Sequence, residues 1–328
     1  MIEFILFCTG LIILIKGANF LVDGSSSLAT RLRIAPIVIG LTIVSFGTSA
    51  PELVVSLASA LKGNTDIALG NVIGSNIFNI LFILGVGAII YPLIIAKNTV
   101  WKEIPFSFLA AILLVILGLQ ASINAGFLDP SIATSIETEG VINRSSGLVL
   151  LSFFIIFLYY TFGIAKTTGR ADLSVKNISL PIATLLIVAG LAALTIGSKI
   201  AVDNAVSLAR LLNISDALIG LTLMAIGTSL PELFTNIAAV RKKNSDIAIG
   251  NIVGSNIFNI FLILGITAVI RDLPIKGIQI VDILVLWLAT LLFFSLIFVW
   301  KRHTIGRKEG VIMILCYIAY TIFLIIRG

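Results

Sequence analysis

The sequence predicts an all-α polytopic membrane protein, with ten transmembrane helices arranged as two inverted five-helix repeats. Of its 328 residues, 59% are hydrophobic and only 12% are charged, whereas soluble domains carry about 25% charged residues. The apolar runs approach the ~20 residues that a membrane-spanning helix needs, and they lack the alternation of barrel strands. Finally, residues 40–85 match residues 220–265 at 27 of 46 positions without a gap.

Ten spans follow one another between polar breaks that are mostly short. Their expected ranges are 4–30, 37–61, 66–92, 104–121, 147–165, 179–211, 217–240, 246–270, 280–300 and 309–326. Lys16 interrupts the first apolar run, and no small-residue cleavage site follows it. We therefore expect a first membrane span there and not a removed signal peptide.

The internal repeat divides the chain into two units of five spans each. The first unit covers 1–165 and contains the motif 40–85, a cytosolic linker covers 166–178, and the second unit covers 179–328 with the motif 220–265. Because five is an odd number, the second unit enters the membrane from the opposite side. Such inverted repeats are common among secondary transporters.

Basic residues predict the orientation of the chain. With the N-terminus outside, the inner breaks hold 14 Lys and Arg residues and the outer breaks hold 6. The excess of positive charge on the inner side favours extracytoplasmic positions for both termini. The net charge of +6 is scattered over helix ends without a basic stripe, so no nucleic-acid partner is expected.

A polar motif lies in the middle of the second span and recurs in the seventh. It reads Gly47-Thr48-Ser49-Ala50-Pro51-Glu52, and residues 227–232 read Gly-Thr-Ser-Leu-Pro-Glu. Pro51 lacks the N–H that would bond to the carbonyl of Gly47, and free carbonyls inside a membrane need a partner or a cavity. A proline kink accounts for one copy, but a costly buried glutamate in both copies indicates a functional site.

The spans that follow each motif carry a polar stripe with a spacing of four residues. The stripes consist of Asn71, Ser75 and Asn79 in the first repeat and Asn251, Ser255 and Asn259 in the second, with Asn76 and Asn256 to one side. We expect these side chains to belong to the same functional site as the glutamates. The alternative role is hydrogen bonding between helices, and the case for it is strongest at Asn71 and Asn251.

The donor set contains carboxylate, amide, hydroxyl and carbonyl oxygens. Oxygen donors suit Ca²⁺, Na⁺ or Mg²⁺, and Mg²⁺ is disfavoured because it gives up its water reluctantly. Cys8 and Cys316 lie in apolar runs and His303 lies at a span end, so zinc and copper are not expected. Two carboxylates balance one divalent or two monovalent cations, and mutual exclusion at one site is the physical basis of antiport.

Four aspartates occupy span ends at matching positions of the repeats. Asp23 and Asp203 are expected to have a structural or gate-edge role, and Asp203 can pair with Lys199 four residues before it. Asp66 and Asp246 open the third and eighth spans, where an acidic residue stabilises a helix N-terminus.

The two motifs resemble the alpha repeats of the sodium/calcium exchangers, in the prokaryotic branch of the calcium/cation antiporter superfamily. The resemblance covers nearly the whole chain and implies a site between helices 2, 3, 7 and 8. It implies that helices 1 and 6 slide over the remaining bundle to alternate access. The ion ligands that it implies are Glu52, Glu232, Thr48, Thr228, Ser49, Ser229, Ser75, Ser255, Asn79 and Asn259, with backbone carbonyls of Ser45 and Ala225.

The expected function is therefore exchange of Na⁺ for Ca²⁺, with these ions and the lipid bilayer as the only partners, no cofactor, and a functional monomer. A H⁺/Ca²⁺ antiporter is the alternative, because both glutamates could exchange protons. A K⁺-dependent exchanger is a further one, although that branch carries aspartate where this chain has Asn259. A calcium channel would need no counter-ion, and an enzyme would need a nucleophile and base that the sequence does not offer.

Overall fold

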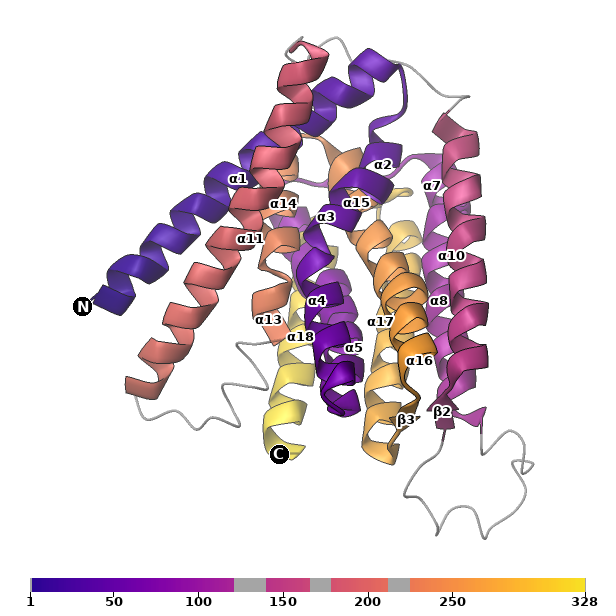
Figure 1. Cartoon of the computed structure of the whole chain (residues 1–328). Coiled ribbons are helices and arrows are strands. Elements are labelled where there is room, and N and C mark those ends of the chain that lie inside the picture. Colours follow the sequence, from indigo (N-terminus) through magenta and orange to yellow (C-terminus); the bar gives the residue numbers. More distant parts are fainter. Residues whose placement is uncertain (1, 121–139, 166–177, 212–224, 328) are drawn as a thin grey trace, which may run out of the picture.

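The computed structural model describes residues 2–120, 140–165, 178–211 and 225–327, and it is an assembly of long helices (Figure 1). Within these ranges, eight helices are long and apolar enough to cross a membrane, and a bent pair would make nine. The predicted span 217–240 begins outside the described residues. The chain is thus a multi-pass integral membrane protein, as its composition predicts.

In the described part of residues 2–165, helices are grouped into five successive segments. In order, its elements are α1 Ile2–Leu32; α2 Pro36–Ile39, η1 Gly40–Val44, α3 Ser45–Thr48 and α4 Ala50–Leu61; α5 Thr65–Ile77, η2 Phe78–Ile83 and α6 Leu84–Ile90; β1 Leu93–Ile94; α7 Lys97–Trp101 and α8 Glu103–Gly118; β2 Gly140–Ile142; and α10 Arg144–Ala165.

The second half repeats this order within the part that the structure describes. Its elements are α11 Leu180–Leu211; α13 Ala225–Thr228 and α14 Leu230–Arg241; α15 Ser245–Ile257, η5 Phe258–Leu264 and α16 Gly265–Ile270; β3 Leu273–Ile275; α17 Gly277–Val299; β4 Thr304–Ile305; and α18 Arg307–Arg327.

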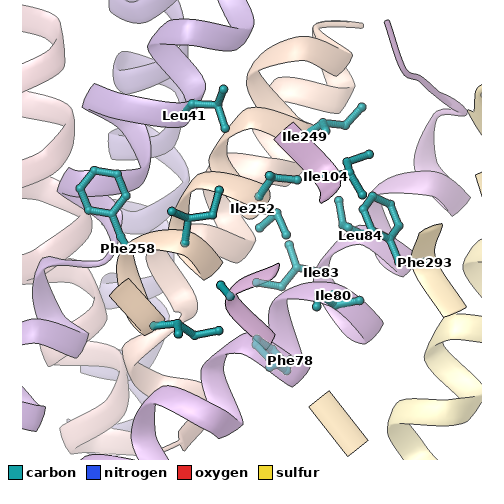
Figure 2. Packing of buried hydrophobic residues seen from close by; sticks show 14 of the residues in the cluster. Leu41, Phe78, Ile80, Ile83, Leu84, Ile104, Ile249, Ile252, Phe258 and Phe293 are labelled. Atoms are coloured by element: carbon teal, nitrogen blue, oxygen red, sulfur yellow. The ribbon is translucent and has the colours of Figure 1, made fainter. Parts of the chain in front are cut away.

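Two helical segments form the centre of the bundle. In the most apolar stretch of Ser245–Ile270, 83% of residues are buried, and the corresponding value for Thr65–Ile90 is 72%. The value falls to 17% in Arg307–Arg327, whose outer face is apolar and suited to lipid. Figure 2 shows the core around the two central segments, where Leu84 and Ile252 lie among neighbouring aliphatic and aromatic side chains.

The second span is bent, as its proline predicts. Pro36–Thr48 and Ala50–Leu61 meet at an angle of 44°, and Pro51 lies in the first turn of α4, where its missing N–H costs no helical bond. The structure adds π-helical turns η1, η2 and η5, which the sequence pattern does not predict. Such turns are rare and concentrate at functional sites.

The expectation of a purely helical chain is wrong in the breaks. β1 pairs with β4, and β2 pairs with β3, each as a short antiparallel ladder. Backbone groups that leave a helix need new hydrogen-bond partners, and breaks that meet at one end of the bundle supply them to each other. Breaks assigned to the same side of the membrane thus lie together in both ladders.

Helices α1 and α11 pack against each other along their length and run in opposite directions (Figure 1). Glycines allow this close approach: a Cβ on Gly10 would lie 2.6 Å from the nitrogen of Ala201, and one on Gly17 would lie 3.0 Å from the oxygen of Gly190. A Cβ on Gly24 would lie 2.7 Å from the oxygen of Ala183. Since backbone atoms cannot give way locally, the two helices form one tightly packed unit.

We predict that Gly17→Val destabilises the protein, because the added side chain forces α1 away from the backbone of α11. Overpacking of this kind costs about 1–3 kcal/mol. The measurement is the thermal unfolding of the detergent-solubilised protein, monitored as the loss of the folded peak in size-exclusion chromatography after heating. Gly163→Ala is the control, since a Cβ there meets nothing within 4 Å; equal melting of both variants would contradict the tight packing.

Candidate functional site

Two glutamates lie at the centre of the bundle, each in the first turn of a helix after a break. Glu52 belongs to α4 and Glu232 to α14, and both are fully buried. Neither forms an ion pair with a basic side chain of the described ranges, in contrast to Asp23, Asp66 and Asp282. Burying an ionised carboxylate without a counter-charge is very costly, so each of these groups needs either a proton or a bound cation to neutralise it.

Each carboxylate is held by a serine from the other repeat. Ser229 donates a hydrogen bond to Glu52 Oε1 at 3.0 Å, and Ser49 donates one to Glu232 Oε1, also at 3.0 Å. Both serines directly precede the helix that carries their own repeat's glutamate. The reciprocal bonds therefore join the two broken helices at the site.

The central helices add a second layer of reciprocal contacts. Ser75 and Ser255 each donate to the glutamate of their own repeat at 3.4 Å. Thr48 donates to Asn251 Oδ1 at 3.0 Å, and the repeat-related bond runs at 3.2 Å from Thr228 to Asn71. The hydroxyl groups are thus aligned around the two carboxylates by amides from the opposite repeat.

Four asparagines cross between the two central helical segments. Asn79 Nδ2 donates to Asn256 Oδ1 at 3.0 Å, and Asn259 Nδ2 donates to Asn76 Oδ1 at 2.9 Å. Asn79 lies in η2 and Asn259 in η5, so both π-helical turns carry a side chain of the site. Because the amide nitrogen of each of these two residues already donates a hydrogen bond, its Oδ1 atom remains as the group that can accept one or bind a cation.

Within the described parts of the chain, four repeat-related acceptor oxygens of the site receive no hydrogen bond. These are Oε2 of Glu52 and of Glu232, and Oδ1 of Asn79 and of Asn259. All four residues are fully buried. Acceptor atoms left in this state usually bind water or an ion, and the carboxylate–amide–hydroxyl combination matches the preferences of Ca²⁺ and Na⁺.

Comparisons with known proteins agree with this chemistry. The family profile described as "Sodium/calcium exchanger protein" matches residues 2–163 and 182–326. The chain belongs to the sodium/calcium exchanger family. Among its relatives is "Sodium/calcium exchanger MaX1" from Methanosarcina acetivorans, with 32% identity over 347 residues that cover 98% of each chain. "Inner membrane protein YrbG" from Escherichia coli is 36% identical over 321 residues, covering 94% of this chain and 92% of its own.

A solved structure of a sodium-calcium exchanger is also similar over nearly the full length. It is that of NCX_Mj soaked with Na⁺ and Ca²⁺, with a TM-score of 0.80, 32% sequence identity and coverage of 97% of each chain. This exchanger and the present chain share a fold, and the match extends well beyond the two motifs.

In the structure of the present chain, most of the predicted site residues lie close together. Glu52 bonds to Ser229 and Ser75, and Glu232 bonds to Ser49 and Ser255. Thr48 and Thr228 bond to amides of the opposite repeat, and Asn79 and Asn259 form separate pairs with Asn256 and Asn76. The carbonyl of Ser45, a predicted ligand, lies beside the site and accepts the hydroxyl of Thr48 at 3.4 Å. This carbonyl also accepts the N–H of Ser49 at 2.9 Å, and Ala225 opens α13.

The other asparagines have a larger part in the site than their sequence pattern indicates. Asn71 donates to Ser56 at 2.9 Å and to the carbonyl of Glu52 at 3.2 Å, which fixes the helix that carries the carboxylate. Asn76 and Asn256 receive the amide bonds of the crossed pairs. Their positions beside the four-residue stripe were the only signal, and that signal does not reveal a partner in the opposite repeat.

The charged residues outside the site differ in part from the expectations. The predicted pair Lys199–Asp203 is not formed, while Asp23 pairs with Lys242 at 2.8 Å. Asp66 does open a helix, and it also bonds to Lys276 of the break before α17. A separation of four residues permits an ion pair on a helix but does not ensure that it forms.

We predict that Glu52→Gln or Glu232→Gln abolishes calcium uptake while the protein still folds. Either change keeps the side-chain volume and removes one of the two negative charges, and charge interactions are strong in such a low-dielectric site. The measurement is radioactive calcium uptake into proteoliposomes, with folding checked by chromatography. Glu309→Gln is the control, because Glu309 is a buried glutamate that accepts the N–H of Gly306 outside the site. Normal uptake by either site variant would rule out this role.

Proposed function

We propose that this chain is a secondary antiporter that exchanges Na⁺ for Ca²⁺ by alternating access. The observation that carries the proposal is the pair of fully buried carboxylates, one from each repeat. Among the described residues neither has a basic partner, and one oxygen of each has no hydrogen-bond partner. Two negative charges match one Ca²⁺ or two Na⁺. Since the charges cannot neutralise both kinds of ion at full occupancy, binding of one disfavours the other.

The proposed ligands are the two carboxylates together with the oxygen atoms that the sequence motifs predict. Glu52 and Glu232 bind both ions at the centre, and Ser75, Asn79, Ser255 and Asn259 extend the site on both sides. Thr48, Ser49, Thr228 and Ser229 contribute hydroxyl or backbone oxygens, with Ser45 and Ala225 as carbonyl donors. The reciprocal hydrogen bonds support this assignment, as does the similarity to the solved exchanger that was soaked with Na⁺ and Ca²⁺.

The proposed architecture is ten membrane helices in two inverted repeats, 1–165 and 179–328, joined by a cytosolic linker at 166–178. The antiparallel packing of α1 and α11 supports it, because these are the first helices of the two repeats. Both termini are then extracytoplasmic. A monomer suffices for transport, since one chain supplies both carboxylates.

Alternating access requires a part of the protein to move relative to the site. The tightly packed unit of α1 and α11 is the proposed moving part, sliding along the two broken helices and the central segments. Both helices carry glycines at their mutual contact, which keeps them together during such a movement. The crossed asparagine pairs hold the central segments as the stationary part.

Proton coupling and potassium dependence are the competing versions of this function. The neutral hydroxyl and amide groups that surround the carboxylates favour Na⁺ as the counter-ion, because they have no use in proton exchange. Asn259 replaces the aspartate of the potassium-dependent branch, so the site lacks a third negative charge.

We predict that an outward Na⁺ gradient drives calcium into proteoliposomes and that a pH gradient alone does not. The neutral oxygen donors around Glu52 and Glu232 can replace the hydration shell of Na⁺ but offer nothing to a proton. The measurement is calcium uptake under each gradient, with the membrane potential clamped. Equal uptake under the pH gradient would favour the proton antiporter.

We predict that exchange proceeds at the same rate when choline replaces K⁺ on both sides. Without a carboxylate at position 259, the site has no added charge to hold a monovalent ion beside Ca²⁺. Asn259→Asp is the companion variant, and it should alter ion selectivity by adding that charge. If uptake is lost without K⁺ and returns when K⁺ is restored, Asn259 does not determine whether exchange depends on K⁺.

A further inference from the structure

An ion pair ties α1 to the end of α14, away from the ion site. Lys242 Nζ lies 2.8 Å from Asp23 Oδ1 and donates to the carbonyl of Asn19 at 3.1 Å. Asn244 Nδ2 donates to Ser26 Oγ at 3.1 Å beside it. These contacts close one end of the interface between α1 and α14.

The sequence contains a second copy of this pair that the structure leaves apart. Asp23 and Lys242 correspond by the 180-residue repeat to Asp203 and Lys62, with both residue types kept. Asp203 lies on α11 and Lys62 directly follows α4. These two residues are both described and form no ion pair with each other. In Figure 1 the lower end of α11 lies away from α4, at the end of the molecule opposite to the first pair.

The same asymmetry is visible beside the ion site. A Cβ on Gly47 would meet Leu191 of α11, and one on Gly227 would meet Val202 of the same helix. Ser198, also of α11, donates to the carbonyl of Gly227 at 2.8 Å. In a symmetric arrangement Gly227 would face Leu11, the repeat equivalent of Leu191. The unit of α1 and α11 is therefore displaced toward one end of the bundle.

We propose that Asp23–Lys242 and Asp203–Lys62 are alternative latches, and that each forms in only one of the two access states. This inference rests on the proposed alternating access. Because the glycine contacts hold α1 and α11 together, a slide that separates Asp23 from Lys242 carries Asp203 toward Lys62. The described structure shows the state with the first latch closed.

The pair has the properties that a reversible latch needs. The side chains of Lys242 and Asp23 are 32% and 40% exposed, and ion pairs at such positions contribute little and break readily. The two latches differ in one respect: Ser26 corresponds to Val206, which cannot accept the bond that Asn244 makes. The first latch therefore holds its state more strongly than the second one.

Reversible cross-linking tests the alternation directly. The pairs are Asp23→Cys with Lys242→Cys and Asp203→Cys with Lys62→Cys, each made in a chain carrying Cys8→Ser and Cys316→Ser. A short bis-methanethiosulfonate reagent is added to membranes in Na⁺, in Ca²⁺ and in choline. We expect both pairs to cross-link, with yields that change in opposite directions between conditions. Each cross-link should stop exchange until a reductant is added.

Asp23→Cys with Lys62→Cys is the matched control, since it joins opposite ends and should not cross-link. A second measurement removes the charge of the second latch. Asp203→Asn destabilises the state in which that latch is closed, so the cross-linking yield of the first pair should rise about two- to fivefold, the effect of one exposed ion pair. Asp203→Lys combined with Lys62→Asp should return that yield to its original value.

The outcomes separate this inference from the proposed function. If the second pair never cross-links, or if both yields rise and fall together while the unmodified chain exchanges Na⁺ for Ca²⁺, the alternative latches are refuted. If the unmodified chain shows no sodium-driven calcium uptake, the proposed function itself fails.

Discussion

The structure depends on the burial of two carboxylates without a protein counter-charge. Glu52 and Glu232 are fully enclosed, and serine hydroxyl groups from both repeats donate hydrogen bonds to them. These donors satisfy one oxygen of each carboxylate and leave the other open. The rest of the bundle keeps these two groups in place and excludes lipid from them, while the remaining electrostatic cost is left for a mobile ion to offset.

Much of this arrangement could be predicted from the sequence. The stretch from Gly47 to Glu52 located the bend, because a proline interrupts the helical hydrogen bonds and a glutamate inside an apolar run needs a polar site. The gapless match between 40–85 and 220–265 predicted that both copies serve one site. These inferences succeed because the cost of an unpaired polar group in a membrane is high, so such a residue is retained there only with a partner.

Other features could not be predicted, since they arise from contacts between distant segments. The crossed bonds of Asn79 with Asn256, and of Asn259 with Asn76, need two helices at a defined depth and rotation. Local spacing gives neither quantity. The ion pair of Asp23 with Lys242 joins residues more than 200 positions apart, which no helical spacing reveals.

The reciprocal serine bonds have a consequence for the origin of such a chain. Ser49 serves the glutamate of the second repeat and Ser229 that of the first, so neither half contains a complete carboxylate environment. A single five-helix protein inserted into the membrane in both orientations would nevertheless form every one of these bonds as an antiparallel homodimer. Gene duplication and fusion would then preserve an existing site, and later divergence, such as Ser26 against Val206, would first make the two halves unequal.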